Sequence, residues 1–191
     1  MNFILASGSL RRQELIRRMG IDFQVIVSEF DEDTVPYEGD PETYVKILAS
    51  EKAKNILSEE TSNSFILGAD TVVCAEGEIL GKPADREEAF LMMKMLQDNT
   101  HEVYSGLALI HEEKGILDTV SRKTSVRFCS MSDEEIHAYL DQNEWQDKAG
   151  AYGIQGAAGL FIEGIEGDYY NVMGLPLNTL YHMLRKHQII L

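Results

Sequence analysis

The stretch Asn2-Phe-Ile-Leu-Ala-Ser-Gly-Ser-Leu-Arg-Arg-Gln-Glu14 decides how the chain begins to fold. A short apolar run predicts a buried strand, a turn rich in small hydroxyl residues follows it, and an amphipathic helix then begins. Arg11 and Arg12 fall in the first turn of that helix, where cations are disfavoured because the N-terminus already carries a partial charge of roughly +0.5. Backbone N–H groups, the Ser7 and Ser9 hydroxyls and two guanidinium groups therefore indicate an anion site, and phosphate is the anion that fits it. The alternative is a helix capped by Ser9 with two solvated arginines.

Working outward from this stretch, strands and helices alternate along the chain, with some strands adjacent as hairpins. Strands are expected over residues 3–6, 23–28, 65–75, 79–80, 101–111, 115–128, 160–165 and 169–173. Helices are expected over residues 9–19, 40–57, 85–97, 132–142 and 176–187. The pattern predicts an α/β protein with a mixed sheet flanked by helices.

Composition narrows the class of function. The chain has 191 residues, of which 44% are hydrophobic and 26% charged, as in an ordinary soluble globular protein. Its formal net charge of −15 at pH 7 repels polyanions, so we expect no nucleic-acid polymer as a partner. A small phosphorylated ligand stays compatible, because a local basic pocket outweighs a distant acidic surface at physiological screening.

Cysteine usage and hydropathy indicate a cytoplasmic location. Cys74 and Cys129 have no Cys or His partner at metal-ligand spacing and are typical of a reducing compartment. The apolar run at residues 3–6 is too short for a signal peptide, and no basic region precedes it. No apolar run approaches the roughly 20 residues that a membrane span requires, so we expect no membrane partner.

An aspartate interrupts the most apolar of the expected strands, in Gly68-Ala-Asp-Thr71. Aspartate is depleted in strands and costly to bury alone, so Asp70 indicates a contact with a metal ion, a lysine or a substrate. A turn-capping aspartate is the alternative. Lys82, in Gly81-Lys-Pro83, is able to reach a phosphate as a point charge or else lies in solvent. This motif is not a Walker loop, since proline stands where Ser or Thr is required.

Two further features indicate ligand contacts. Lys52 falls on the apolar face of its expected helix, which indicates an inward-facing cation unless the side chain snorkels to solvent. Residues 147–156 read Asp-Lys-Ala-Gly-Ala-Tyr-Gly-Ile-Gln-Gly, and their glycines permit close approach of the backbone to a ligand. Tyr152 is able to stack on a ring, and Gln155 offers both a donor and an acceptor to a base edge, unless the segment is only a tight structural loop. Together these features indicate a nucleotide site.

Six motifs together resemble those of the Maf family of nucleoside triphosphate pyrophosphatases, in the family's order and across nearly the whole chain. They are Ser7-Gly-Ser-Leu-Arg-Arg12, Glu51-Lys-Ala53, Gly68-Ala-Asp-Thr-Val72, Gly81-Lys-Pro83, Asp147-Lys-Ala-Gly-Ala-Tyr-Gly-Ile-Gln-Gly156 and Gly174-Leu-Pro176. The fifth motif is similar to that of the subfamily acting on dTTP and UTP. Leu10 departs from the family, which commonly has proline there; leucine is compatible with the helix start, so we expect the phosphate site to be kept.

The resemblance implies a single Maf-like domain over residues 1–191, an elongated mixed sheet with two lobes around a central cleft, as in inosine triphosphate pyrophosphatases. It implies hydrolysis between the α- and β-phosphates to a nucleoside monophosphate and pyrophosphate, dependence on a divalent cation such as Mg²⁺ or Mn²⁺, and a homodimer. It also implies that Asp70 is the proton acceptor. The residues that it implies for substrate choice are Arg11, Thr71 and Gln155.

Phosphoryl chemistry requires positioning and neutralisation of charge, which extends these roles to further residues. The residues expected to hold the triphosphate are Ser7, Ser9, Arg12, Lys52 and Lys82. Glu32 and Asp70 are the expected metal ligands, because a Mg²⁺-type ion takes one or two carboxylates plus phosphate oxygens and water. Asp70 is either ligand or base, and the metal is expected to supply much of the water activation because neighbouring cations make Asp70 a weaker base.

Two other functions remain open. A pyrophosphatase acting on another nucleotide, such as ITP or 7-methyl-GTP, would share the chemistry. A non-catalytic nucleotide-binding regulator of septum formation, the process to which the family is linked, would keep the basic pocket but would not need Asp70. Turnover of a nucleotide panel separates these functions.

Overall fold

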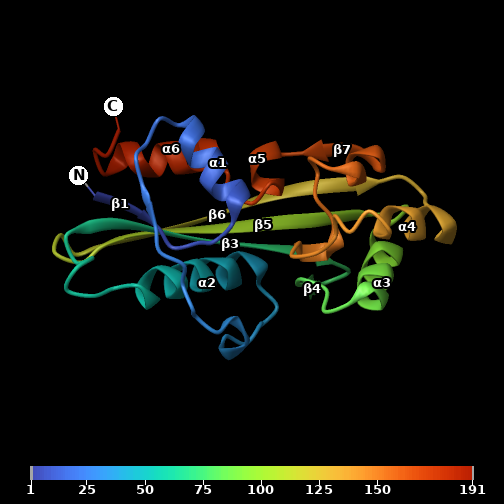
Figure 1. Cartoon of the computed structure of the whole chain (residues 1–191), viewed down its shortest axis with the longest axis horizontal. Helices are drawn as coiled ribbons and strands as arrows, with labels where there is room; N and C mark the ends of the chain where they lie inside the picture. The colour runs from blue at the N-terminus through green and yellow to red at the C-terminus, as the bar shows by residue number, and fades with distance from the viewer. Residues whose placement is uncertain (1, 191) are drawn as a thin grey trace.

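The computed structural model describes residues 2–190, so the ends of the expected domain, residues 1 and 191, lie outside the described part. Three long strands, β3 (Ser64–Ala75), β5 (Thr100–His111) and β6 (Ile116–Phe128), form the centre of a seven-stranded sheet that runs the length of the molecule (Figure 1). The strand order is β2-β1-β3-β5-β6-β7, and β4 (Glu78–Leu80) pairs with β3. The outer strands are β1 (Asn2–Leu5), β2 (Gln24–Val25) and β7 (Ile162–Glu166).

The sheet is mixed, as predicted. β1 pairs in parallel with both β2 and β3, whereas β3, β5, β6 and β7 pair antiparallel in succession. The antiparallel pair of β5 and β6 is the expected long hairpin, and its register runs from Thr100 opposite Arg127 to His111 opposite Ile116.

One edge of β3 has a gap in its pairing, and this gap positions the site. β1 covers β3 as far as Leu67, and β4 covers it from Val73 onward. Residues 68–72 therefore pair with β5 on one edge and with no strand of the described chain on the other. The gap opens because the chain leaves β1 through the Ser7–Ser9 turn into a helix rather than continuing beside β3.

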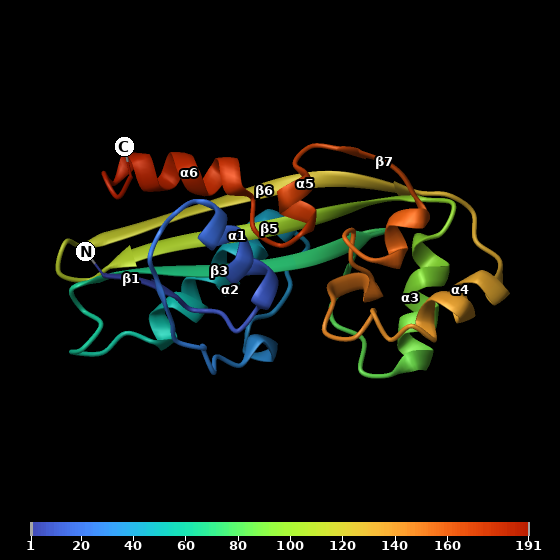
Figure 2. The same cartoon turned by 45° about the horizontal axis from the view of Figure 1, so that its top comes forward.

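Helices cover both faces of the sheet (Figures 1 and 2). On one face lies α2 (Pro41–Asn55), which approaches so closely that a Cβ at Gly68 would lie 2.0 Å from the Ala49 carbonyl oxygen, and one at Gly106 2.1 Å from that of Val45. Glycine at these two positions therefore sets the distance between helix and sheet. The opposite face carries α1 (Leu10–Arg18) and α6 (Leu177–Lys186).

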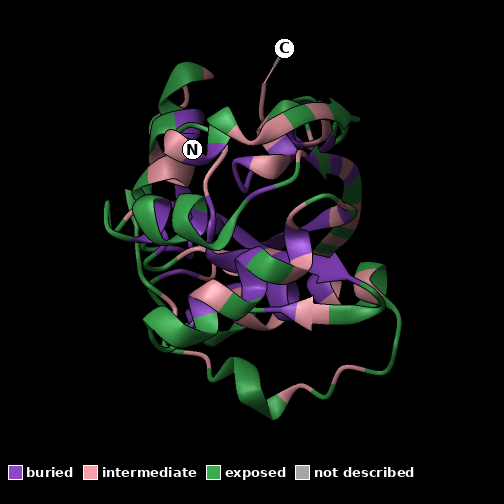
Figure 3. Cartoon of the chain, turned by 90° about the vertical axis from the view of Figure 1, so that its right-hand side faces the viewer, coloured by how far each residue is buried: buried purple, intermediate pink, exposed green. Residues whose placement is uncertain are grey.

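The core divides into clusters on either side of the gap. Leu15 and Ile16 of α1 and Leu180 and Leu184 of α6 pack in one cluster with inward residues of β3 and β5. A second cluster surrounds α3 (Arg86–Leu96) and α4 (Asp133–Leu140) at the other end of the long strands (Figure 2). Figure 3 shows buried residues concentrated in the central strands and the inward faces of the helices. No helix within residues 2–190 combines the length and the apolar character that crossing a membrane requires.

Three expected elements were wrong in type or extent. The expected strand at 169–173 is a helix, α5 (Tyr169–Val172), because the Asp168 carboxylate accepts a hydrogen bond from the Tyr170 N–H at 2.8 Å and caps it. The strand expected over 160–165 begins later, as β7, because the 3₁₀ helix η3 (Ala157–Leu160) precedes it. The strand expected over 23–28 is shortened to β2, since only Gln24 and Val25 pair with β1.

Candidate active site

A cavity of about 1030 Å³ opens along the unpaired edge of β3. Its lining comes from segments far apart in the sequence: the turn before α1, the acidic segment before α2, the helix α2 itself, β3 and the glycine-rich segment 147–152. Most residues that the sequence singled out therefore converge on one space. We describe its lining as two walls.

The first is the charged wall, made of Ser7, Ser9, Arg11, Arg12, Lys52 and Asp70. Ser9 is the N-cap of α1, and its hydroxyl accepts a hydrogen bond from the Arg12 backbone N–H at 3.4 Å. The Ser9 N–H in turn donates to the Ser7 hydroxyl at 3.3 Å. The turn is thus both a helix cap and part of the cavity lining, so the two interpretations of this turn are compatible.

Arg12 is held by three groups of the protein. Its Nη1 donates to the Ser7 hydroxyl at 3.2 Å, its Nη2 to the Thr71 hydroxyl at 3.0 Å and its Nε to the Gly174 carbonyl at 2.9 Å. Burial lowers the pKa of Arg12, and the nearby carboxylates, Asp70 foremost, oppose that shift. A guanidinium has five N–H donors, so Arg12 is oriented by three of them and keeps others for a ligand.

Arg11 and Leu10 behave differently from Arg12. Arg11 lines the cavity and is half-buried; burial lowers its pKa, whereas Asp147 across the cavity raises it. Leu10 occupies the first helical position with 77% of its surface exposed, so this departure from the family pattern leaves the helix start intact.

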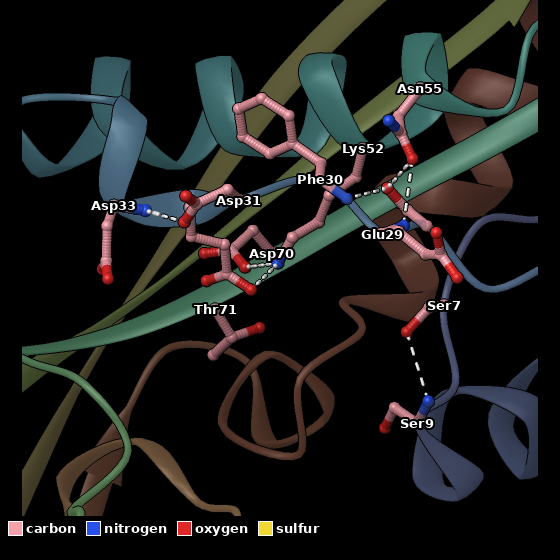
Figure 4. A network of polar contacts seen from close by, with 12 residues as sticks. Ser7, Ser9, Glu29, Phe30, Asp31, Asp33, Lys52, Asn55, Asp70 and Thr71 are labelled. Atoms are coloured by element: carbon pink, nitrogen blue, oxygen red, sulfur yellow. Dashed lines mark hydrogen bonds and ion pairs between the residues drawn. The ribbon is translucent and has the colours of Figure 1, made fainter.

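Lys52 and Asp70 meet at the floor of the charged wall (Figure 4), and Glu32 joins them there. The Lys52 ammonium lies 2.5 Å from Asp70 Oδ1 and 2.7 Å from Glu32 Oε1. Asp70 is only 5% exposed, and its second oxygen, Oδ2, is buried with no hydrogen-bond partner within residues 2–190. Lysine is therefore the Asp70 partner among the three that the sequence allowed, and the helical spacing of Lys52 correctly indicated an inward-facing cation.

The acidic segment that carries Glu32 is fastened to α2 by Asn55, which the sequence did not single out. The Asn55 side-chain oxygen accepts hydrogen bonds from the Ser28 hydroxyl at 3.0 Å and the Glu29 N–H at 2.9 Å (Figure 4). Asp31 then caps the 3₁₀ helix η1 (Glu32–Thr34). These contacts explain how an exposed loop residue, Glu32, reaches the Lys52 ammonium that also pairs with the buried Asp70.

The structure brings the two expected metal ligands together on one ammonium group. Within residues 2–190 there is no group of three or more His, Cys, Asp or Glu side chains arranged to hold a metal ion. Two carboxylates are nevertheless the donor set that Mg²⁺ takes when phosphate oxygens and water supply the rest. The unpartnered Asp70 Oδ2 fits such an ion, because a buried carboxylate oxygen without a donor is costly.

The glycine-rich segment and Lys82 form the opposite side of the cavity. The Gly150 N–H donates to the Gly81 carbonyl at 3.0 Å, which places the segment beside Lys82, an exposed residue of the cavity lining. Lys148 also lines the cavity; burial lowers its pKa, and the charge of Arg11 lowers it further. Lys148 was missed as a site residue, although its position at the start of the glycine-rich motif was a usable signal.

The second wall is the apolar wall, made of Val73, Val103, Ala149, Tyr152 and Val172. Val73 and Val103 are directly opposite each other on β3 and β5, so their side chains share one face of the sheet. Gln155 does not line the cavity: it is exposed, and it follows Tyr152 at a distance of three residues in the chain. Of the expected site residues, Gln155 alone lies outside the lining.

Comparisons with known proteins identify the family of the chain. The family model described as "Maf-like protein" matches residues 2–187. A protein of Clostridium novyi (strain NT) named dTTP/UTP pyrophosphatase is 49% identical over 181 residues, covering 95% of each chain. A protein of the same name from Clostridium beijerinckii is 50% identical over 188 residues, covering 98% of this chain and 100% of the relative.

A solved structure was also found. It is a nucleoside-triphosphatase / dITP/XTP pyrophosphatase from Mycobacterium abscessus, with a TM-score of 0.44, 15% identity and coverage of 100% of this chain and 99% of that one. The family assignment depends on the family model and on the curated relatives, both of which span nearly the whole chain. The chain belongs to the Maf family.

Proposed function

We propose that this protein is a nucleoside triphosphate pyrophosphatase that hydrolyses dTTP and UTP to the nucleoside monophosphate and pyrophosphate. The relatives at 49% and 50% identity carry this name. The observation that carries the proposal is a buried Asp70 with one oxygen paired to Lys52 and the other unpartnered, at the floor of a cavity lined with cations.

The charged wall supplies what phosphoanhydride hydrolysis requires. Water attacks the α-phosphorus, the bond between this phosphorus and the bridging oxygen breaks, its electron pair leaves with pyrophosphate, and the water proton passes to a base. Asp70 Oδ2 is the oxygen available to accept that proton, because Oδ1 is occupied by Lys52. The Arg12, Lys52 and Lys82 cations, with Ser7, Ser9 and backbone N–H groups, hold the triphosphate and neutralise the leaving charge.

Glu32 and Asp70 are the residues that would hold a divalent cation, Mg²⁺ or Mn²⁺. When bound, such an ion lowers the pKa of water and polarises phosphate oxygens. Lys52 contacts one oxygen of each of these carboxylates, so the other oxygen of each would be the one offered to such an ion. The Lys52 ammonium, which has three N–H donors, would keep a donor for a phosphate oxygen of the nucleotide.

Substrate selection is assigned to Arg11, Thr71 and Gln155. Arg11 presents a partly buried guanidinium to the cavity. Thr71 acts through its neighbours: its hydroxyl accepts from Arg12 at 3.0 Å and lies 2.8 Å from the Ser105 hydroxyl. Gln155 requires a shift of its segment to reach a base, because it starts outside the cavity lining.

The proposal extends to the setting in which the enzyme works: a cytoplasmic homodimer that removes unwanted nucleotides, with a link to septum formation. The low cysteine content and the net charge of −15 are compatible with a cytoplasmic protein that has no nucleic-acid polymer as a partner.

A nucleotide panel tests the function. Pyrophosphate release is measured with UTP, dTTP, CTP, ITP and 7-methyl-GTP at saturating Mg²⁺ and again at saturating Mn²⁺. We expect UTP and dTTP to give the highest kcat/KM. A preference for ITP or 7-methyl-GTP would replace the substrate assignment, and tight binding without release of pyrophosphate from any nucleotide would favour the non-catalytic regulator.

A further inference from the structure

Two buried histidines lie at the two ends of β5, and their surroundings differ. His101 is 1% exposed and His111 2% exposed, and within residues 2–190 the Nδ1 of each has no hydrogen-bond partner. Each packs edge-on against a phenylalanine ring: His101 against Phe128 at 5.2 Å and His111 against Phe65 at 4.6 Å between ring centroids. The two residues thus share burial, strand and type of packing, and differ in what their other nitrogen contacts.

His101 reaches the cavity through a second residue. Its Nε2 lies 2.7 Å from the Tyr152 hydroxyl, and the rings of His101, Phe128 and Tyr152 contact one another edge to face at 5.0–5.3 Å. Tyr152 is 6% exposed and belongs to the apolar wall. His111 is not among the residues that line the cavity.

The backbone around Tyr152 is fixed, so the remaining freedom is that of its ring. The Tyr139 hydroxyl donates to the Ala151 carbonyl at 3.0 Å, and the Gly150 N–H donates to the Gly81 carbonyl at 3.0 Å. A Cβ at Gly150, whose φ is +66°, would lie 2.9 Å from a Val73 methyl carbon. Within residues 2–190, His101 is the only hydrogen-bond partner of the Tyr152 hydroxyl.

The hydrogen bond between His101 and Tyr152 depends on the protonation state of the His101 ring. Burial lowers the pKa of His101 to about 4, so the ring is neutral near pH 7 and carries one N–H. With the proton on Nδ1 the ring accepts from the Tyr152 O–H through Nε2, and with the proton on Nε2 it donates to the Tyr152 oxygen, so a neutral ring forms the bond in either tautomer. In both tautomers Nδ1 is the ring nitrogen without a partner within residues 2–190.

We propose that Tyr152 is the surface of the apolar wall against which the base of the nucleotide lies, and that His101 is the positioning residue that holds the Tyr152 ring in place. This inference rests on the proposed function. A planar pyrimidine needs an apolar or aromatic contact, which Tyr152, Val73 and Val103 supply together. Without the His101 bond the buried hydroxyl has no partner, and the nearest partner is water in the cavity. The ring then turns into the cavity and takes the space of the base.

The first experiment compares His101→Phe with His111→Phe, the matched control at the other end of the strand. Affinity is measured by calorimetry for α,β-imido-dTTP, which has a base, and for inorganic tripolyphosphate, which has none. We expect His101→Phe to lower the affinity for the imido nucleotide about tenfold and that for tripolyphosphate less than about twofold, because only the contact with the base changes. His111→Phe leaves both affinities unchanged.

A double variant separates positioning from general structural damage. In His101→Phe/Tyr152→Phe neither buried polar group remains, so affinity for the imido nucleotide returns to within about threefold of the original protein. His101→Gln keeps an amide group near the Nε2 position that is both a donor and an acceptor, and it also restores affinity. Tyr152→Ala removes the contact surface itself and weakens the imido nucleotide selectively, which tests the inference even if His101→Phe does not fold.

Three outcomes would overturn the inference: equal losses for the imido nucleotide and tripolyphosphate, equal losses in the His101 and His111 variants, or no loss in Tyr152→Ala. These measurements record binding and need no turnover. An original protein that binds the nucleotide in this pattern but releases no pyrophosphate would refute the proposed hydrolysis and leave the His101–Tyr152 assignment standing.

Discussion

The charged wall and the apolar wall lie on the same strand edge but are built by different forces. Asp70 and Val73 are three residues apart on β3, yet Asp70 is fixed by an ion pair with α2 and Val73 by packing against β5 and the glycine-rich segment. The charged wall holds groups that stabilise developing charge, and the apolar wall holds surface that stabilises a bound ring. The unpaired residues 68–72 of β3 thus carry the chemistry, and the apolar wall begins at Val73, where β4 pairs with β3.

The alternation of side chains along β3 explains how one edge supplies both faces of the charged wall. Asp70 faces α2 and meets Lys52, whereas Thr71 faces the opposite side and meets Arg12. Cations therefore approach the edge from both faces of the sheet. The two walls differ enough that a variant in one should leave the other intact, and the following predictions test that difference from the largest expected effect to the smallest.

Asp70→Asn should produce the largest effect. Asparagine keeps the size of the side chain but removes the proton acceptor and the charge that faces Lys52, so we expect kcat for UTP to fall about thousandfold. Pyrophosphate release at saturating nucleotide and Mg²⁺ is the measurement. Asp118→Asn is the control, since Asp118 is also a partly buried carboxylate in ion pairs, with Lys186 and His187, and does not line the cavity. Near-full turnover in Asp70→Asn would remove Asp70 from both the base and the ligand role.

The second prediction concerns His101, which lies behind the apolar wall, and the loss of stability of the protein in acid. Burial lowers the pKa of His101 from 6.5 to about 4, so the folded protein binds this proton less readily than the unfolded chain. The neutral ring contributes stability that is fully present above pH 6.5 and is lost as the pH falls toward 4, by about 3 kcal/mol. Urea unfolding measures the free energy of unfolding at pH 7.5 and at pH 4. We expect the decrease between these two pH values to be smaller by this amount in His101→Phe than in the original protein. An equal drop in both proteins would show that folding does not lower the pKa of His101.

Asp70 and His101 also show how much of the site can be predicted from the sequence. The unusual position of Asp70 in an apolar strand and the helical spacing of Lys52 were visible locally, and they indicated a buried partner for Asp70 and an inward-facing cation. The structure adds that the two side chains pair with each other. The bond between His101 and Tyr152 joins residues 51 positions apart, and that of Arg12 with Gly174 joins residues 162 apart. Periodicity and capping rules describe neighbours in the chain, so such contacts lie beyond them.

The error at residues 169–173 has the same origin. This segment was expected to be a strand, but the Asp168 cap started a helix there, and the Thr124 hydroxyl, which bonds the Asp168 backbone at 3.0–3.1 Å, stabilises that turn from a distant strand. Tertiary context overrode a local pattern there. Gln155 stays a prediction: the path of its segment leaves it exposed and outside the cavity lining.

The third prediction returns to the charged wall. Lys52→Met removes the ammonium between Glu32 and Asp70, so we expect affinity for tripolyphosphate to fall about thirtyfold, the size of one lost charged hydrogen bond. Affinity for Mn²⁺ without nucleotide should rise, because the two carboxylates no longer have an internal cation. Lys54→Met is the control: Lys54 pairs with Glu51 on the exposed side of the same helix. Calorimetry gives both affinities, and unchanged tripolyphosphate binding would contradict a phosphate role for Lys52.

Gln155→Ala should give the smallest effect and decides whether selection extends beyond the apolar wall. Gln155 makes no side-chain hydrogen bond within residues 2–190 and is exposed, so its removal costs little in folding. If its amide reads the pyrimidine edge, KM for UTP and dTTP should rise about fivefold while kcat and tripolyphosphate affinity stay constant. Gln142→Ala, at an exposed glutamine beyond α4, is the control. An equal loss for every nucleotide in the panel would indicate an altered loop, and an unchanged KM would leave base recognition to Tyr152 and its neighbours in the apolar wall.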